Sequence, residues 1–215
     1  MVRTVLLVLA AASFAVGCVS YGVYQSPETV EPGSTEVGLG TMLAYSPDRQ
    51  EDDPVVVPIE SAILVRHGLA RNVDLGGRAW FFPATMFEDG AVVIGLYGDV
   101  RYRFIEGPVM LTGSVGVSAM KAGEFLSLGV YPALLAGTER FYGGVRLIYV
   151  GVRHGDDEGD SELLTADGPL IGLVTGASFG NRWMLRPEIN LYFADGFSTL
   201  LVTPGVSLQY RFGDG

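Results

Sequence analysis

The sequence predicts an all-β protein, a closed antiparallel up-and-down β-barrel of ten strands that crosses a membrane. From Thr35 onward, apolar and polar residues alternate with a period of two, which is the period of side chains along a β-strand. Charged residues gather on the polar side of this alternation. The 215-residue chain is 48% hydrophobic, yet beyond its N-terminus no uncharged apolar run reaches the roughly 18 residues that a spanning helix needs.

Composition excludes several classes of protein. A net charge of −10 at pH 7 argues against a nucleic-acid partner or an anionic membrane surface. The single cysteine excludes an intramolecular disulfide and a cysteine-based zinc site. The glycines form no phosphate-binding loop, and we expect no cofactor.

The first 17 residues have the features of an export signal. Arg3 precedes an apolar stretch from Val5 to Val16, which has the length of a signal core. Residues 15–18, Ala-Val-Gly-Cys, resemble the bacterial lipobox, which implies lipidation of Cys18 after removal of residues 1–17. The family usually has Leu where this chain has Ala15, so ordinary cleavage near Gly17 is the alternative. Residues 18–34 contain two prolines and no clear period, and we expect a tether there.

The region 35–212 divides into ten alternating segments. In the fourth, Val92, Ile94 and Leu96 share one parity, whereas Asp99 and Arg101 share the other. No segment shows the period of an amphipathic helix. The segments 35–45 and 125–135 alternate least regularly, which leaves eight strands as an alternative to ten. The predicted strands are 35–45, 58–67, 72–82, 91–104, 109–119, 125–135, 141–153, 169–179, 182–193 and 199–212.

The apolar faces are expected to contact lipid and the polar faces to line the lumen. Glycines on the polar faces would leave room for arginine side chains, and aromatic residues near the strand ends are typical of interfacial girdles. The basic residues are almost all arginine, which suits a confined polar interior. The predicted charge network of the lumen comprises Glu60, Arg66, Asp74, Arg78, Asp99, Arg101, Arg103, Arg146, Arg186 and Glu188.

These lumen charges allow two interpretations. Buried charges must be paired, because an unpaired one costs several kcal/mol. A salt-bridged network would largely close a small barrel, and we favour this interpretation. The alternative is a narrow pore or polar-ligand site, in which the excess of arginine over acidic residues would favour anions.

The connections between strands alternate in length. Residues 68–71, 105–108, 136–140 and 180–181 are short links, and the intervening ones are longer or acidic. Outer-membrane barrels have short periplasmic turns and longer external loops. Ten strands then place both termini in the periplasm, where a lipidated Cys18 would reach the inner leaflet.

At this point the chain resembles the small outer-membrane β-barrel proteins of Gram-negative bacteria. The last strand carries the motif, since Val206, Leu208, Tyr210 and Phe212 alternate and end in an aromatic residue. The resemblance implies a bacterial outer-membrane location, with outer-membrane lipid and the barrel-assembly machinery as partners. It names no solute or protein partner. Bulges or strand limits are expected at Pro132, Pro187 and Pro204, because proline cannot donate to a ladder.

Two further groups could carry chemistry. The acidic loop 154–162 could bind calcium, but its spacing does not match the helix–loop–helix pattern, so we expect a solvated loop and no metal. His154 near Asp156 is only superficially similar to the His–Asp pair of omptin proteases, and His67 has no evident partner. We therefore predict no catalytic residues and no enzyme.

The leading hypothesis for function is an outer-membrane barrel with a structural or interaction role, acidic external loops and a largely plugged lumen. The alternative is a narrow channel or conduit for a small or hydrophobic solute. A second alternative is a lipid-anchored soluble barrel that binds a ligand, which would need the apolar faces to point inward.

Overall fold

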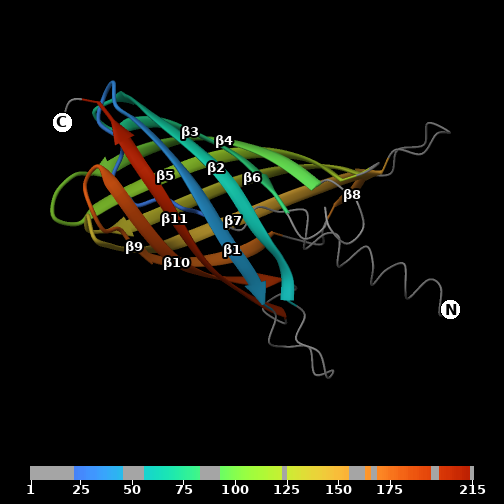
Figure 1. Cartoon of the computed structure of the whole chain (residues 1–215). Coiled ribbons are helices and arrows are strands. Elements are labelled where there is room, and N and C mark those ends of the chain that lie inside the picture. Colours follow the sequence, from blue (N-terminus) through green and yellow to red (C-terminus); the bar gives the residue numbers. More distant parts are fainter. Residues whose placement is uncertain are drawn as a thin grey trace, which may run out of the picture.

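A computed structural model describes residues 22–45, 56–82, 93–122, 125–154, 163–165, 169–194 and 199–213. The chain forms ten long strands and one strand of three residues (Figure 1). Among the described residues no helix is long and apolar enough to cross a membrane. The strands are β1 Thr35–Tyr45, β2 Val56–Ala70, β3 Val73–Phe81, β4 Val93–Ile105, β5 Met110–Ala122, β6 Phe125–Gly137, β7 Phe141–His154, β8 Leu163–Thr165, β9 Leu170–Ala177, β10 Trp183–Ala194 and β11 Thr199–Phe212.

The ten long strands close into an up-and-down barrel. Each pairs antiparallel with its neighbour in sequence, and β7 pairs with β9 because β8 only extends the end of β7. The first and last strands close the ring, with Thr35 opposite Phe212. The prediction of a closed ten-stranded barrel is confirmed, and both weakly alternating segments, β1 and β6, are full members of the sheet.

Apolar side chains point out of the barrel and charged ones point in. Along β4, the outward Leu96 and Val100 are 61% and 50% exposed, whereas the inward Asp99 and Arg101 are buried. The period of two therefore produces an apolar outer wall and a polar interior. The soluble ligand-binding barrel is excluded, because it requires the apolar faces inside.

Four short connections gather at one end of the barrel, which we call the short-turn end, namely residues 71–72, 106–109, 138–140 and 178–182. At the opposite end only residues 123–124 join β5 and β6, so this connection is shorter than the sequence predicts. The last residues of β11 lie at the short-turn end, beside the start of β1 (Figure 1). The longer predicted connections include residues outside the described ones.

Aromatic residues cluster on the outside near the short-turn end. The ring centroids of Trp183 and Tyr210 lie 4.8 Å apart, those of Tyr210 and Phe212 lie 4.6 Å apart, and those of Tyr102 and Phe104 lie 5.1 Å apart. Amphipathic rings at one level of an apolar wall are typical of a membrane interface.

The three prolines do not cause the bulges that the sequence predicts. Pro132, Pro187 and Pro204 each stay paired with one neighbouring strand. Beside Pro132 and Pro204 the ladder to the other neighbour lapses without a shift of register, and β9 pairs with β10 only beyond Pro187. A proline lacks one N–H group, so it can remain in a strand where only one ladder is interrupted.

Candidate functional site

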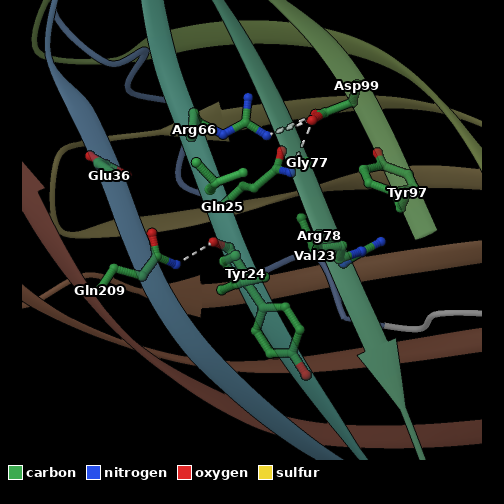
Figure 2. A pocket seen from close by; sticks show the side chains of 12 residues that line it. Val23, Tyr24, Gln25, Glu36, Arg66, Gly77, Arg78, Tyr97, Asp99 and Gln209 are labelled. Atoms are coloured by element: carbon green, nitrogen blue, oxygen red, sulfur yellow. Dashed lines mark hydrogen bonds and ion pairs between the residues drawn. The ribbon is translucent and has the colours of Figure 1, made fainter. Parts of the chain in front are cut away.

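The interior near the short-turn end contains a network of paired charges. Asp74 stands opposite Arg101 on the neighbouring strand and accepts hydrogen bonds from it at 2.9 and 2.5 Å. Arg66 binds Asp74. It also binds Asp99, at 2.7 Å, as Figure 2 shows. These side chains are all less than a tenth exposed. Charges this deeply buried are stable only when opposite charges and hydrogen bonds surround them.

Other arginines of the predicted network have different partners. The guanidinium carbon of Arg78 lies 4.1 Å from the ring centroid of Tyr97, and that of Arg146 lies 4.6 Å from the ring centroid of Tyr131. Such cation–π contacts are strongest where water is excluded. Arg103 lies closer to the rim, where it contacts Glu106 at 3.6 Å.

Sequence reasoning predicted Arg186 but missed its partners in a second cluster, which lies on the adjacent strands β1, β11 and β10. Glu36 accepts hydrogen bonds from Arg211 at 2.7 Å and from Arg186 at 3.2 Å. Arg186 also donates to Gln209 at 2.5 Å. Alternation along the strands could have identified these residues. Glu36 has the same inward parity as Gly38 on β1, and Arg211 and Gln209 alternate with the outward residues of β11.

Residues 22–34 form what we call the N-terminal plug, of which residues 22–30 lie inside the barrel and residues 31–33 are exposed. They have no regular strand or helix, as expected of a tether, but Tyr24 and Val30 are only 2% and 1% exposed. The C-terminal part of the plug lies at the short-turn end, where the Gly33 N–H donates to the Gly68 carbonyl at 2.9 Å. At its other end, the Gly22 carbonyl accepts hydrogen bonds from Arg78 and Arg146, well inside the barrel.

The lumen binds the plug with both carboxylates and cations. Glu188 accepts the N–H groups of Val23 and Tyr24 at 2.8 and 2.6 Å, and Asp74 accepts that of Val30 at 2.9 Å. Figure 2 shows Gln209 reaching Tyr24, whose carbonyl accepts its amide N–H at 2.9 Å. No periodicity marks this segment, so the tether prediction missed its burial.

The half of the lumen nearer the long loops is filled by rings and apolar side chains. Burial raises the pKa of the Tyr24 phenol, and the carboxylates of Glu60 and Glu188 raise it further, so this ring enters the cluster uncharged. The buried cluster comprises Tyr24, Met42, Ala62, Trp80, Phe82, Tyr97, Met120, Tyr131, Ile148, Tyr192 and Leu201.

Most of the inward glycines that the sequence reserves for arginines make room for these rings, whereas Gly76 does make room for the guanidinium group of Arg66. A Cβ atom at Gly95 would overlap the Trp80 ring, and one at Gly116 would overlap the Tyr97 ring. The same holds for Gly129 with Tyr131, Gly172 with Tyr192, and Gly40 with Tyr24. A ring folded over a neighbouring glycine fills the wall of a barrel without bending it outward.

The plug, the charge network and the rings leave little free space between them. The cavity among Tyr24, Arg66, Arg78 and Tyr97 has a volume of about 20 Å³. A space of this size holds about one water molecule. It is too small for a solute beside the plug.

The remaining candidate residues do not form a second site. His67 is exposed at the short-turn end and lies 2.9 Å from the Thr35 hydroxyl. Among the described residues, no group of three His, Cys, Asp or Glu side chains could hold a metal ion. Cys18, most of the acidic loop 154–162 and the side chain of His154 lie outside the described part of the chain.

Comparisons with known proteins found matches only among solved structures, since no family model and no curated protein matches. The chain is similar to the outer membrane protease OmpT from Escherichia coli, at 10% identity and a TM-score of 0.45, over 87% of this chain and 100% of that one. The chain is also similar to the translocator domain of autotransporter NalP from Neisseria meningitidis, at 14% identity and a TM-score of 0.44, over 98% of this chain and 96% of that one. A third similar structure is Ail of Yersinia pestis, at 14% identity and a TM-score of 0.37, over 84% of this chain and 99% of that one. The barrel fold itself rests on this chain's own strand pairing.

Proposed function

We propose that the chain is a bacterial outer-membrane barrel with a structural or interaction role, whose lumen is closed by its own N-terminal plug. The outward apolar wall supports a place in the membrane, because residues such as Leu96 and Val115 are 61% and 58% exposed in mid-strand. In water such a wall would be a continuous exposed apolar surface far larger than soluble monomers carry. Outer-membrane lipid is therefore its partner, and the acidic external loops are the surface left for other partners.

The closed lumen is the observation that carries the proposal. The plug crosses the short-turn end, the charge network surrounds it, and the rings fill the other half. Carboxylates that could act as catalytic bases are already engaged, since Asp74 and Asp99 bind arginine and Glu188 binds main-chain N–H groups. We therefore propose no enzymatic role for the interior.

Current across a planar bilayer tests this proposal. The full chain with Cys18 replaced by serine is refolded and inserted, and its current is compared with that of the same chain lacking residues 22–33. We expect no steady current from the full chain, because the plug and the rings obstruct the lumen. Steady conductance of the full chain would overturn the closed-barrel proposal.

A narrow conduit is the second candidate, and the charge of the interior favours it. Among the strand residues that the structure describes, seven inward arginines face five inward acidic residues, so ions that enter an open lumen meet a positive lining. The residues are Arg66, Arg78, Arg101, Arg103, Arg146, Arg186 and Arg211, with Glu36, Glu60, Asp74, Asp99 and Glu188. A conduit predicts that the full chain conducts and prefers anions.

The seated plug sets a condition on lipidation of Cys18, which stays a prediction. Residues 18–21, which precede Gly22 in the chain, span at most about 14 Å. Gly22 contacts Arg146, which lies five residues, or about 16 Å along the strand, from the start of β7. For a strand tilted by about 40° this is a depth of about 12 Å, so a straight path would need nearly the whole length of residues 18–21. The way back to that end is filled by the rest of the plug. An acylated Cys18 in the inner leaflet therefore requires Gly22 to leave its place.

Metabolic labelling with palmitate tests this condition. If the cells label Cys18, we expect the labelled chains to expose the plug to a thiol reagent at an introduced Ser26→Cys. Chains with Cys18→Ser should protect the same position, since Ser26 is 1% exposed. Labelled chains that still protect residue 26 would contradict the exclusion between lipidation and a seated plug.

A further inference from the structure

The lumen recognises the plug mainly through its main chain. The carboxylates of Glu188 and Asp74 accept main-chain N–H groups, and arginine, glutamine and threonine side chains donate to main-chain carbonyls. Few plug side chains bind the lumen by hydrogen bonds or ion pairs, namely Gln25, Glu28 and Thr29. The plug main-chain groups that bind side chains of the lumen are Gly22 O, Val23 N, Tyr24 N, Tyr24 O, Ser26 O, Pro27 O, Glu28 O and Val30 N.

Glu188 shows that this arrangement suits a peptide. Its carboxylate is 2% exposed and, within the described part of the chain, is in no salt bridge. Two of its hydrogen bonds come from Val23 and Tyr24 of the plug, and one comes from Asn190 at 2.9 Å. Without a peptide in the lumen, this buried carboxylate would lose most of its partners, which is costly for a charged group.

Arg101 provides the complementary contact for carbonyl groups. It is held by Asp74 and donates to the Ser26 carbonyl at 2.7 Å and to the Glu28 carbonyl at 3.0 Å. A guanidinium group has five N–H donors in a fixed plane, so one arginine can bind an acid and two carbonyls together. Contacts of this kind do not depend on the peptide's side chains.

One plug side chain provides selectivity. The Tyr24 ring packs over Gly40 and belongs to the buried cluster that includes Trp80. A large aromatic ring in a closed pocket is the usual anchor of a peptide ligand. The lumen thus offers main-chain contacts along its length and one pocket for a ring.

We propose that the lumen is a binding site for an extended polypeptide segment, and that residues 22–34 are its resident ligand. A second segment with an aromatic anchor can take this place when the plug withdraws. The plug continues directly into β1, and among the described residues its one β-bridge to the sheet pairs Pro32 with Gly68. This inference rests on the closed lumen proposed above.

Peptide exchange tests the inference. The variant lacking residues 22–33 carries Cys18→Ser and Trp183→Phe, so that Trp80 is its only tryptophan. A synthetic peptide of residues 22–34 is titrated while Trp80 fluorescence is followed, after a gel with unheated and boiled samples has shown a folded barrel. We expect saturable binding. Replacing the side chains of Gln25, Glu28 and Thr29 by alanine should change the affinity by no more than a few fold.

N-methylation of the peptide distinguishes main-chain recognition from other binding. Methyl groups on the nitrogens of Val23, Tyr24 and Val30 remove the N–H donors and should weaken binding about tenfold or more. In the barrel, Glu188→Gln should also weaken binding, whereas Glu139→Gln in an exposed turn should not. Equal affinity of methylated and unmodified peptides would overturn the inference.

A second variant keeps the experiment decisive if the variant lacking residues 22–33 fails to fold. A protease site replaces the exposed residues 31–33, the full chain folds around its plug, and cleavage then allows exchange with labelled peptide. Failure of any peptide to exchange overturns the inference. A non-conducting full chain would still support the closed barrel, so the two proposals fail separately.

Discussion

The charged side chains of the interior have two roles, since they pair with one another and they bind the plug. Arg66 and Arg101 neutralise Asp74, and Arg186 and Arg211 neutralise Glu36. The hydrogen-bonding capacity that remains is directed at main-chain groups of the plug. The surplus of arginine that the sequence predicts for the lumen is thereby explained, because peptide carbonyls accept the extra donors.

Replacing Tyr24 by phenylalanine should leave the plug seated and the barrel at least as stable. The Tyr24 hydroxyl is buried and has no hydrogen-bond partner among the described residues. A buried hydroxyl without a partner costs about 1–3 kcal/mol, which the substitution removes. The measurement is the midpoint of urea unfolding in lipid bilayers. Tyr24→Ala is the contrasting variant, expected to lose about 3–5 kcal/mol through the cavity that it leaves.

Glu188→Gln should loosen the plug while leaving the barrel closed. Glutamine keeps the shape but has one oxygen acceptor instead of two, so the N–H groups of Val23 and Tyr24 lose a charged partner. We expect thiol labelling at Ser26→Cys, in a Cys18→Ser chain, to accelerate about tenfold or more. Glu139→Gln, in an exposed turn, is the control. Equal labelling rates in the two variants would contradict the role of Glu188.

The strands show the alternation of apolar and polar residues that made the fold predictable, and the plug shows no such alternation. The predicted bounds of β1 and β11 match the observed strands, and the inward parity of Asp74, Asp99 and Arg101 follows from alternation. The plug has no such signal, because its order comes from partners that are distant in sequence. Inward glycines such as Gly95 and Gly116 were misinterpreted for the same reason, since the ring that covers each of these two lies on another strand.

Gly68→Ala should displace the base of the plug without breaking the barrel. A Cβ atom at this position would overlap the carbonyl oxygens of Val30 and Glu31, which are main-chain atoms and cannot rotate away. Labelling at Ser26→Cys measures the displacement. Gly77→Ala is the matched control, because the nearest atom to its added Cβ is 3.5 Å away. If both variants protect residue 26 equally, the plug does not depend on this close approach.

The whole molecule is a barrel turned inside out relative to a soluble protein, since its apolar residues face outward. This orientation predicts that the cost of a charge depends on depth in the membrane. Val115 lies in the middle of β5 and is 58% exposed, whereas Val109 lies in a short turn and is 61% exposed. Nearly equal exposure makes the pair a direct comparison of depth.

Arginine at these two positions should therefore have different effects. We expect Val115→Arg to destabilise the folded state in bilayers by about 2–4 kcal/mol and Val109→Arg by about 0–1 kcal/mol. Urea unfolding in lipid vesicles measures both values. Similar small losses at the two positions would indicate that the wall does not face hydrocarbon.

Alternation along the chain was sufficient to predict the strands and to place Arg66, Asp99 and Glu188 on the polar faces, and the preference for arginine and the aromatic strand ends then turned these faces inward. These are local properties, because the period of side chains along a strand follows from backbone geometry alone. Closure of the lumen by residues 22–34, the pairing of Glu36 with Arg186 and Arg211, and the rings over glycines became visible only in three dimensions. They depend on contacts between residues far apart in sequence, which no local pattern encodes.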